Sequence, residues 1–226
     1  MILASTQTMW FLTRSSGLVA MILLSASVAL GVVTSVGWSN VRWPRFVTLG
    51  LHRNISLVAV VILALHIATT VLDGFAPIGW LDAVVPLRSP YRPIWLGLGA
   101  VAVDLLLAVT VTSLLRRHIS HAVWRTVHWT AWAAWPAAVL HGLGTGSDTM
   151  NGWAQLVYVA CTAVVLAACW WRIAVGWPAR LKPRVAALVA SVLIPLLVLF
   201  WAVSGPLHTG WARRAGTPTQ TEQQTR

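Results

Sequence analysis

The sequence predicts an all-α fold, a polytopic membrane helical bundle with six transmembrane helices. Hydrophobic residues make up 58% of the 226 residues and charged residues only 9%, whereas a soluble domain carries about 25% charged residues. The apolar residues also occur in long blocks, which is typical of membrane spans rather than of a large soluble core. We therefore expect most of the protein surface to face lipid.

Six blocks reach the length of about 20 apolar residues that a bilayer crossing needs. The first is kept as a span rather than a cleaved signal, because it is long and more arginine follows it than precedes it. The second carries two histidines, the third Asp104, the fourth two more histidines and Pro136, and the fifth both cysteines. The predicted spans are 17–37, 46–71, 94–115, 123–143, 153–173 and 185–203.

The spans divide the chain into three parts. We expect an N-terminal segment at residues 1–16, a transmembrane domain at 17–204 and a disordered tail at 205–226, because the end of the chain is polar and poor in apolar residues. Cys161 and Cys169 lie eight residues apart in one apolar block, too far for a disulfide between them. We interpret both as small buried hydrophobic residues.

The formal charge of +11 would favour nucleic-acid binding in a soluble protein. Here the basic residues gather between the apolar blocks, which indicates topology and lipid headgroup contact and no nucleic-acid partner. The positive-inside rule places the more basic side in the cytoplasm and both termini outside. The ten residues on the basic side are Arg42, Arg45, Arg53, Arg116, Arg117, Arg125, Arg172, Arg180, Lys182 and Arg184.

Four of the seven histidines lie inside predicted spans, where a strongly polar group is costly and is a functional hypothesis by default. His52 and His66 are 14 residues apart, which is about 21 Å along a helix and within about 40° of one face. His128 and His141 are 13 residues apart and would diverge on a straight helix. We predict that Pro136, which lies between them, kinks the helix and restores a common face.

The second and fourth spans run in the same direction, so His52 is level with His128 and His66 is level with His141. Each level then offers two imidazoles from facing helices, as in the cofactor sites of helical bundles. A single zinc or copper site would need all four histidines within a few Å, but the two levels are about 20 Å apart. Two b-type haems with two axial histidines each are the better interpretation, and they suit electron transfer.

These residues carry a resemblance to the ferric reductase-like transmembrane domain family. The chain resembles it in the Leu51-His52-Arg53 and Leu65-His66 pair, in the Val127-His128-Trp129 and Leu140-His141 pair, and in Leu114-Leu115-Arg116-Arg117. The resemblance covers about residues 10–175. It implies a helical bundle with inner haem ligands at His52 and His128, outer ligands at His66 and His141, and an oxidoreductase that transports electrons.

The sequence departs from the longer members of that family, which continue into a flavin and nicotinamide module. No Gly-x-Gly-x-x-Gly motif follows a strand here, so we expect no FAD or NAD(P)H site. The chain is more similar to stand-alone bacterial membrane cytochromes, such as the haem-binding membrane subunit of methionine-sulfoxide reductase systems. This similarity implies the bacterial plasma membrane, a separate flavoprotein or quinol as donor, and an extracytoplasmic protein or ferric iron as acceptor.

Several residues are secondary candidates. Arg53 adjoins a ligand and is a candidate partner of a haem propionate. Arg116 and Arg125 at the inner level, and Arg88 and Arg92 at the outer level, are weaker candidates, because topology also explains the first two. Asp104 is a candidate for structural hydrogen bonding inside the bundle or for a proton relay at a quinol site.

Three functions remain open from the sequence. The first is electron transfer from a cytoplasmic or quinol donor to an external acceptor, and the second is a membrane anchor for a periplasmic reductase. The third is a proton-coupled transporter or channel whose histidines line a proton path, and it predicts water between the second and fourth spans instead of haem. One haem rather than two is also open, since it depends on the kink in the fourth span.

Overall fold

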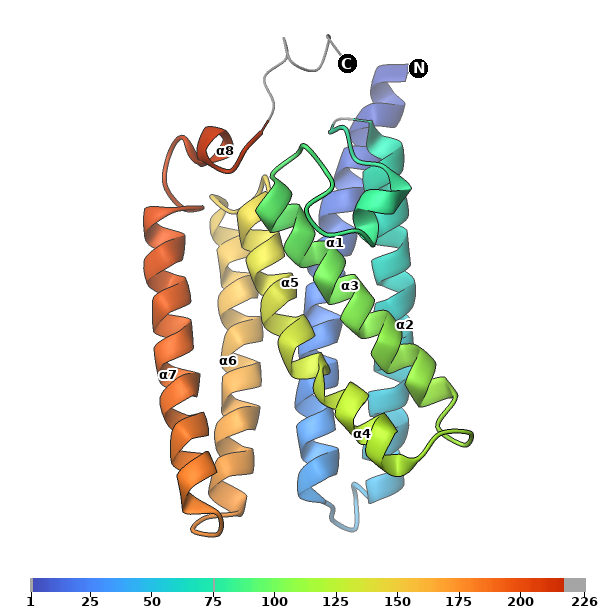
Figure 1. The fold of residues 1–226 in the computed structure, drawn as a ribbon, viewed down its shortest axis with the longest axis vertical. Helices are drawn as coiled ribbons and strands as arrows, with labels where there is room; N and C mark the ends of the chain where they lie inside the picture. Colours follow the sequence, from blue (N-terminus) through green and yellow to red (C-terminus); the bar gives the residue numbers. More distant parts are fainter. Residues whose placement is uncertain (1, 75, 218–226) are drawn as a thin grey trace.

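The computed structural model describes residues 2–74 and 76–217, and within them every regular element is a helix. Long helices run roughly parallel to one another and form a bundle, with the connecting loops at its upper and lower ends in Figure 1. The elements are α1 (Ile2–Val36), α2 (Arg45–Asp73), the short helix η1 (Trp80–Ala83), α3 (Pro93–Leu114), α4 (His121–Trp129), α5 (Ala131–Thr145), α6 (Gly152–Val175), α7 (Leu181–Ser204) and α8 (Trp211–Arg214).

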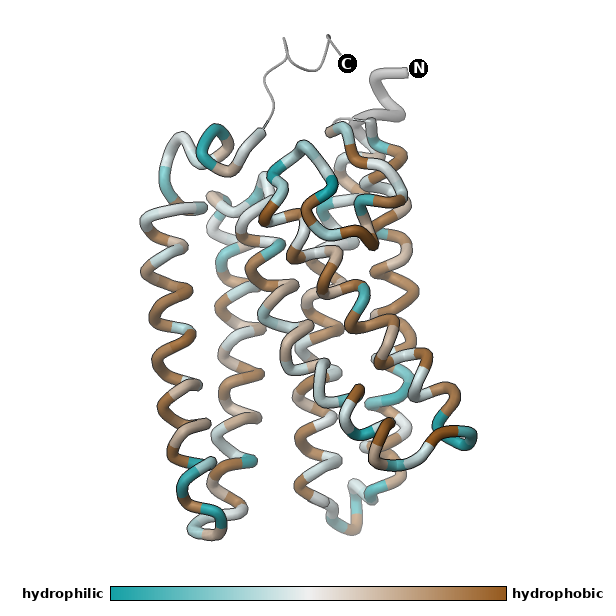
Figure 2. The backbone as a smooth tube through the Cα atoms, in the orientation of Figure 1, coloured by the Kyte–Doolittle hydropathy of each residue, from teal (hydrophilic) through white to brown (hydrophobic). Residues whose placement is uncertain are grey.

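The chain is a multi-pass membrane protein. Five helices among the described residues are long and apolar enough to cross a bilayer: Thr8–Val36 of α1, then α2, α3, α6 and α7. Figure 2 shows apolar residues along the helices and hydrophilic residues gathered toward the loops. The sixth predicted crossing, at 123–143, is divided between α4 and α5, which together lead from the lower end to the upper end (Figure 1).

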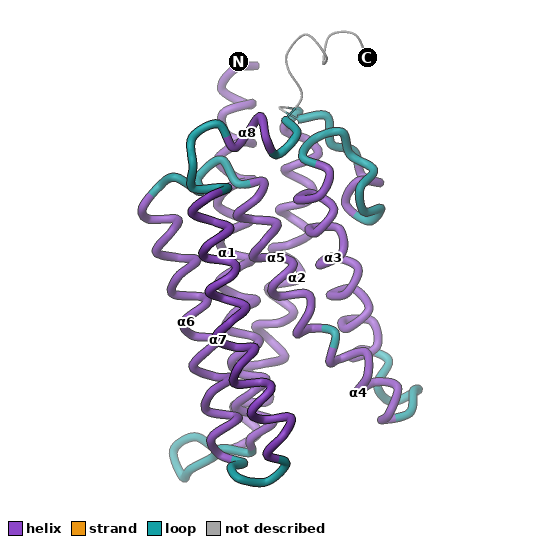
Figure 3. The backbone as a smooth tube through the Cα atoms, turned by 60° about the vertical axis from the view of Figure 1, so that its left-hand side comes forward, coloured by secondary structure: helices purple, strands orange, loops and turns teal. Residues whose placement is uncertain are grey.

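Helix α1 packs along α2, and α3 packs against α5, so these four elements surround the centre of the bundle. Helix α6 packs against α1, and α7 packs mainly on α6 at one edge, as Figure 3 shows from a second side. The loops α1–α2, α3–α4 and α6–α7 lie at the lower end (Figure 1). The ten basic residues of the more basic side therefore lie in or near this lower end.

The interruption in the fourth crossing lies at Thr130, six residues before Pro136. Thr130 donates its backbone N–H to Val127 and its hydroxyl to the same carbonyl at 2.7 Å, which closes α4. Pro136 lies inside α5. The structure therefore differs from the expectation that the proline forms the break, because a threonine that satisfies the last carbonyls of α4 ends the helix first.

Two boundaries also differ from those expected. Helix α1 begins at Ile2 rather than near residue 17, so most of residues 2–16 extends the first span. Of the tail predicted to be disordered, residues 205–217 form turns and α8 over the upper end. Trp211 of α8 donates to the Gly144 carbonyl at 2.9 Å and packs against Trp95 and Trp201. Residues 218–226 of that tail lie outside the described residues.

Candidate functional site

The four intramembrane histidines form two pairs in the centre of the bundle. His52 of α2 faces His128 of α4, with ring centroids 6.2 Å apart and ring planes at 78°. His66 of α2 faces His141 of α5, with centroids 6.4 Å apart and planes at 79°. We call the first the lower pair and the second the upper pair. The structure thus brings together the residues that the helix spacing predicted to be level.

The separation within each pair matches two imidazoles that share one metal ion. Two metal–nitrogen bonds of about 2 Å each account for about 4 Å. The remaining distance, about 2 Å, is the sum of the two ring radii, from each nitrogen to its centroid. A direct hydrogen bond between the rings would bring the centroids closer, so the pairs are spaced for an atom between them.

Backbone carbonyls orient three of the four rings. The Nδ1 of His52 lies 3.0 Å from the Ser27 carbonyl, and the Nδ1 of His66 lies 2.9 Å from the Thr13 carbonyl, both on α1. The Nδ1 of His141 lies 3.0 Å from the Trp95 carbonyl on α3. Because a carbonyl can only accept, each Nδ1 carries the proton, and Nε2 keeps a free lone pair for a metal.

Glycines on neighbouring helices make these close approaches possible. A Cβ added at Gly17 would lie 2.9 Å from Cε1 of His66, and one at Gly31 would lie 3.3 Å from Cε1 of His52. A Cβ at Gly99 would lie 2.5 Å from Nδ1 of His141, which is closer than real contacts allow. The histidine rings therefore lie directly against helix backbone, which also places their Nδ1 atoms within reach of the carbonyls.

Our sequence reasoning missed these glycines, although the sequence contains a signal for two of them. Gly17 and Gly31 are 14 residues apart, the same spacing as His52 and His66. Since α1 and α2 are antiparallel neighbours, equal spacings place each glycine opposite one histidine. Gly99 gives no such signal, because α3 has no second glycine whose distance from Gly99 equals the 13-residue distance between His128 and His141.

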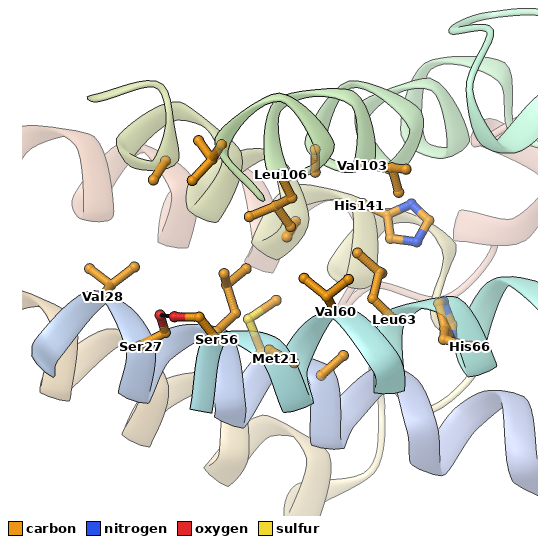
Figure 4. Close-up of a pocket in the computed structure, with 18 of the residues that line it drawn as sticks. Met21, Ser27, Val28, Ser56, Val60, Leu63, His66, Val103, Leu106 and His141 are labelled. Atoms are coloured by element: carbon orange, nitrogen blue, oxygen red, sulfur yellow. Dashed lines mark hydrogen bonds between the residues drawn. The ribbon is translucent and has the colours of Figure 1, made fainter. Parts of the chain in front are cut away.

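Both pairs lie on a cavity of about 1710 Å³ between α1, α2, α3, α4 and α5. Figure 4 shows His66 and His141 at one end of the part drawn and apolar side chains such as Val60, Leu63 and Leu106 beyond them. Ser27 and Ser56 share a hydrogen bond of 2.6 Å in the same wall. The cavity is large enough for sizeable planar ligands and its wall is mostly apolar, as in cofactor sites.

The two ends of the cavity carry opposite charges. Its lower end is lined by five arginines and by no acidic residue: Arg53, Arg116, Arg125, Arg172 and Arg180. Its upper end is lined by Asp73, Asp82 and Asp148 and by one arginine, Arg14. Arg14 forms an ion pair with Asp148 in which both side chains are largely buried. The lower end is therefore suited to anionic groups.

The structure places some of the secondary candidate residues at the cavity and others away from it. Arg53, Arg116 and Arg125 line the cavity. Arg88 instead lies 3.7 Å from Asp82, and the buried Arg92 donates to the Gly144 carbonyl at 3.0 Å. Neither arginine lines the cavity. Asp104 is partly exposed on α3 and is not among the residues that line the cavity.

Comparison with known proteins gives one family. Residues 16–139, just over half of the chain, match the family model described as ferric reductase like transmembrane component. This range contains α2 and α3 and three of the four paired histidines; His141 lies two residues beyond its end. No curated protein and no solved structure matches the chain.

Proposed function

Because the chain belongs to the ferric reductase like transmembrane component family, we propose that it carries electrons across the membrane on two b-type haems. The lower pair, His52 and His128, would hold one haem, and the upper pair, His66 and His141, would hold the other. The observation that carries the proposal is the equal spacing of the two pairs, with ring centroids 6.2 and 6.4 Å apart.

The donor set fits haem iron better than a non-haem ion. Each pair supplies two neutral imidazoles, and haem needs no more from the protein because its porphyrin supplies the other four nitrogens. No group of three or more His, Cys, Asp or Glu residues in the described chain is arranged to hold a metal ion. A bound haem would supply a reversible one-electron couple at each level.

The residues of this chain have three tasks in that function. The backbone carbonyls of Thr13, Ser27 and Trp95 fix the protonated tautomer and the plane of three ligand rings. The mostly apolar wall would keep the interval between the levels poor in water once the haems are bound. Since two axial histidines leave no open position on iron, such a centre favours electron transfer over the binding of a small substrate.

Arginines at the lower end would balance the propionates of the lower haem. Arg53 follows a ligand directly and lines the cavity, and it has no ion pair within the described residues. A guanidinium can donate two parallel hydrogen bonds to one carboxylate. We assign Arg53 this role.

We infer the direction of transfer from the orientation of the chain that the charge distribution favours and from the donors expected for the family. The positive-inside rule assigns the arginine-rich lower end to the cytoplasm. Electrons would enter there from a separate flavoprotein, or from quinol in the membrane, and leave at the upper pair. The acceptor would be ferric iron or an extracytoplasmic protein, including a periplasmic reductase for which this chain serves as the membrane subunit.

Haem quantitation tests the proposal. The chain is produced with ample haem and purified in detergent, and haem is measured by pyridine haemochrome and by reduced-minus-oxidised absorbance. We expect a b-type spectrum and about two haems per chain. His66→Ala and His128→Ala should each lose one haem, and the double variant should lose both.

The matched control is His118→Ala, which replaces an exposed histidine outside the cavity. This variant should keep both haems. A wild-type protein without haem under these conditions would overturn the proposal and favour a proton-coupled transporter, in which the same histidines line a water path.

A further inference from the structure

One of the four paired histidines is held differently from the other three. The Nδ1 of His128 is buried and has no hydrogen-bond partner among the described residues, whereas the other three Nδ1 atoms each face a backbone carbonyl. A buried polar nitrogen without a partner is unusual in a folded protein. Another contact must therefore fix the orientation of this ring.

That contact is the indole of Trp124. The Trp124 and His128 rings are stacked, with centroids 4.9 Å apart and planes at 23°. The two residues are four positions apart on α4, so one helical turn places one side chain over the other. Among the described residues, the rings of the other three paired histidines make no ring-to-ring contact except with their histidine partners.

Trp124 is itself held from two directions. The guanidinium of Arg116 lies 4.2 Å from the centroid of its ring, a cation–π contact. Its Nε1 donates to the Ser113 hydroxyl at 3.3 Å. Arg116 follows α3 and Ser113 lies in its last turn, so the indole is fixed between α3 and α4.

We propose that Trp124 is a positioning residue for the lower haem, whose stacking fixes the ring of His128 in place of the hydrogen bond that orients the other three ligands. The inference rests on the proposed function. A hydrogen bond from the second ring nitrogen makes an imidazole a more basic ligand. His128 lacks that bond, so the ferric state at the lower level is less stabilised and its midpoint potential is the higher of the two.

Two readouts report on this role independently of transfer activity. The electron paramagnetic resonance spectrum of a ferric centre with two histidines depends on the angle between the ligand planes, 78° in the lower pair. The midpoint potential, from redox titration, depends on ligand basicity. Both are measured in the His66→Ala background, where only the lower haem remains, and in the His128→Ala background, where only the upper haem remains.

The test compares Trp124→Leu with two reference variants. We expect Trp124→Leu to broaden the resonance of the lower haem and to shift its midpoint, because the freed ring adopts several orientations. Trp124→Phe, which keeps a stacked ring, should restore both. Trp170→Leu, on α6, should change neither, because its indole is 45% exposed, donates to the Ser191 hydroxyl and does not line the cavity.

Two results would overturn the inference. One is an unchanged resonance and midpoint of the lower haem in Trp124→Leu, and the other is an equal change at the upper haem, which would indicate a general structural effect. If Trp124→Leu does not accumulate, Ser113→Ala removes the hydrogen bond that is one of the two contacts of the indole with the α3 side, and it should shift the lower haem alone; no shift would again overturn the inference. A wild-type protein without haem overturns the proposed function itself, whereas two haems with no Trp124 effect overturn this inference only.

Discussion

Gly99 illustrates how a residue without a side chain can determine a site. The ring of His141 occupies the space that a Cβ at Gly99 would need, and this close approach lets Nδ1 of the ring reach the Trp95 carbonyl on the same helix, α3. The same arrangement recurs at Gly17 and Gly31, where α1 presents backbone to the histidines of α2.

Gly99→Ala should selectively empty the upper level. The new Cβ would lie 2.5 Å from Nδ1 of His141, so the ring must move and lose its bond to the Trp95 carbonyl. Loss of such an orienting partner lowers metal affinity by about 10–100-fold. Pyridine haemochrome should fall from about two haems per chain toward one.

Gly152→Ala is the matched control for that change. It also lies in a helix, at the start of α6, but a Cβ there meets nothing within 4 Å. Haem content should stay unchanged. Equal losses in the two variants would mean that added bulk in a helix, rather than the position of His141, is responsible.

At the scale of elements, the divided crossing α4–α5 is the feature on which both levels depend. His128 of the lower pair lies on α4 and His141 of the upper pair on α5, on opposite sides of Thr130. A continuous helix would turn residues 13 apart to rather different faces. The interruption lets each half present its histidine to α2.

Pro136→Ala should therefore leave both haems in place. The interruption lies six residues earlier, and the bonds that close α4 at Thr130 do not involve the proline. Alanine would restore a backbone donor within α5. Haem content and the absorbance spectrum of the variant check this result. Loss of one haem would show that Pro136, rather than the interruption at Thr130, aligns His128 and His141 with α2.

The helical spans could be predicted because each one is a single continuous run of apolar residues in the sequence. The pairing of His52 with His128 followed from helix rise and from the common direction of the second and fourth spans. The start of α1 could not be predicted in this way, since Arg14 interrupts its apolar run and the carboxylate that neutralises it, Asp148, is 134 residues away. Trp124 was also missed, because the position of its indole depends on Ser113 and Arg116, which lie outside α4.

At the scale of the whole molecule, the Arg14–Asp148 pair joins the first helix to the loop between α5 and α6. Asp148 also accepts from Asn151 at 2.6 Å, and Arg14 lies over the ring of Trp10 at 3.6 Å. The carbonyl of Thr13, which orients His66, is next to Arg14 in the chain. The pair thus connects the closure of the bundle with the geometry of the upper level.

Arg14→Gln should destabilise the fold clearly. It leaves the Asp148 carboxylate, whose side chain is only 9% exposed, without a cation. Removing one member of a buried pair costs about 3 kcal/mol. The midpoint temperature of unfolding in detergent should fall.

Arg88→Gln provides the comparison for this measurement. It breaks the other ion pair of the described chain, with Asp82, in which the Arg88 side chain is 49% exposed and the Asp82 side chain 11%. Asp82 keeps the hydrogen bond from the Gly79 backbone N–H at 2.7 Å, and a pair whose cation is exposed contributes less than about 1 kcal/mol, so the midpoint should change little. Similar shifts in the two variants would contradict the structural role of Arg14.

The separation of the two histidine levels along α2 has an energetic consequence under the proposed function. Fourteen residues of helix span about 21 Å of a hydrocarbon core that is about 30 Å thick. An electron that passes between the levels crosses about two thirds of the membrane voltage, so each transfer is electrogenic. With the cytoplasm negative, outward transfer is assisted by about 1.5 kcal/mol per 100 mV. An energised membrane would thus favour reduction at the upper level, and every electron delivered would partly discharge it.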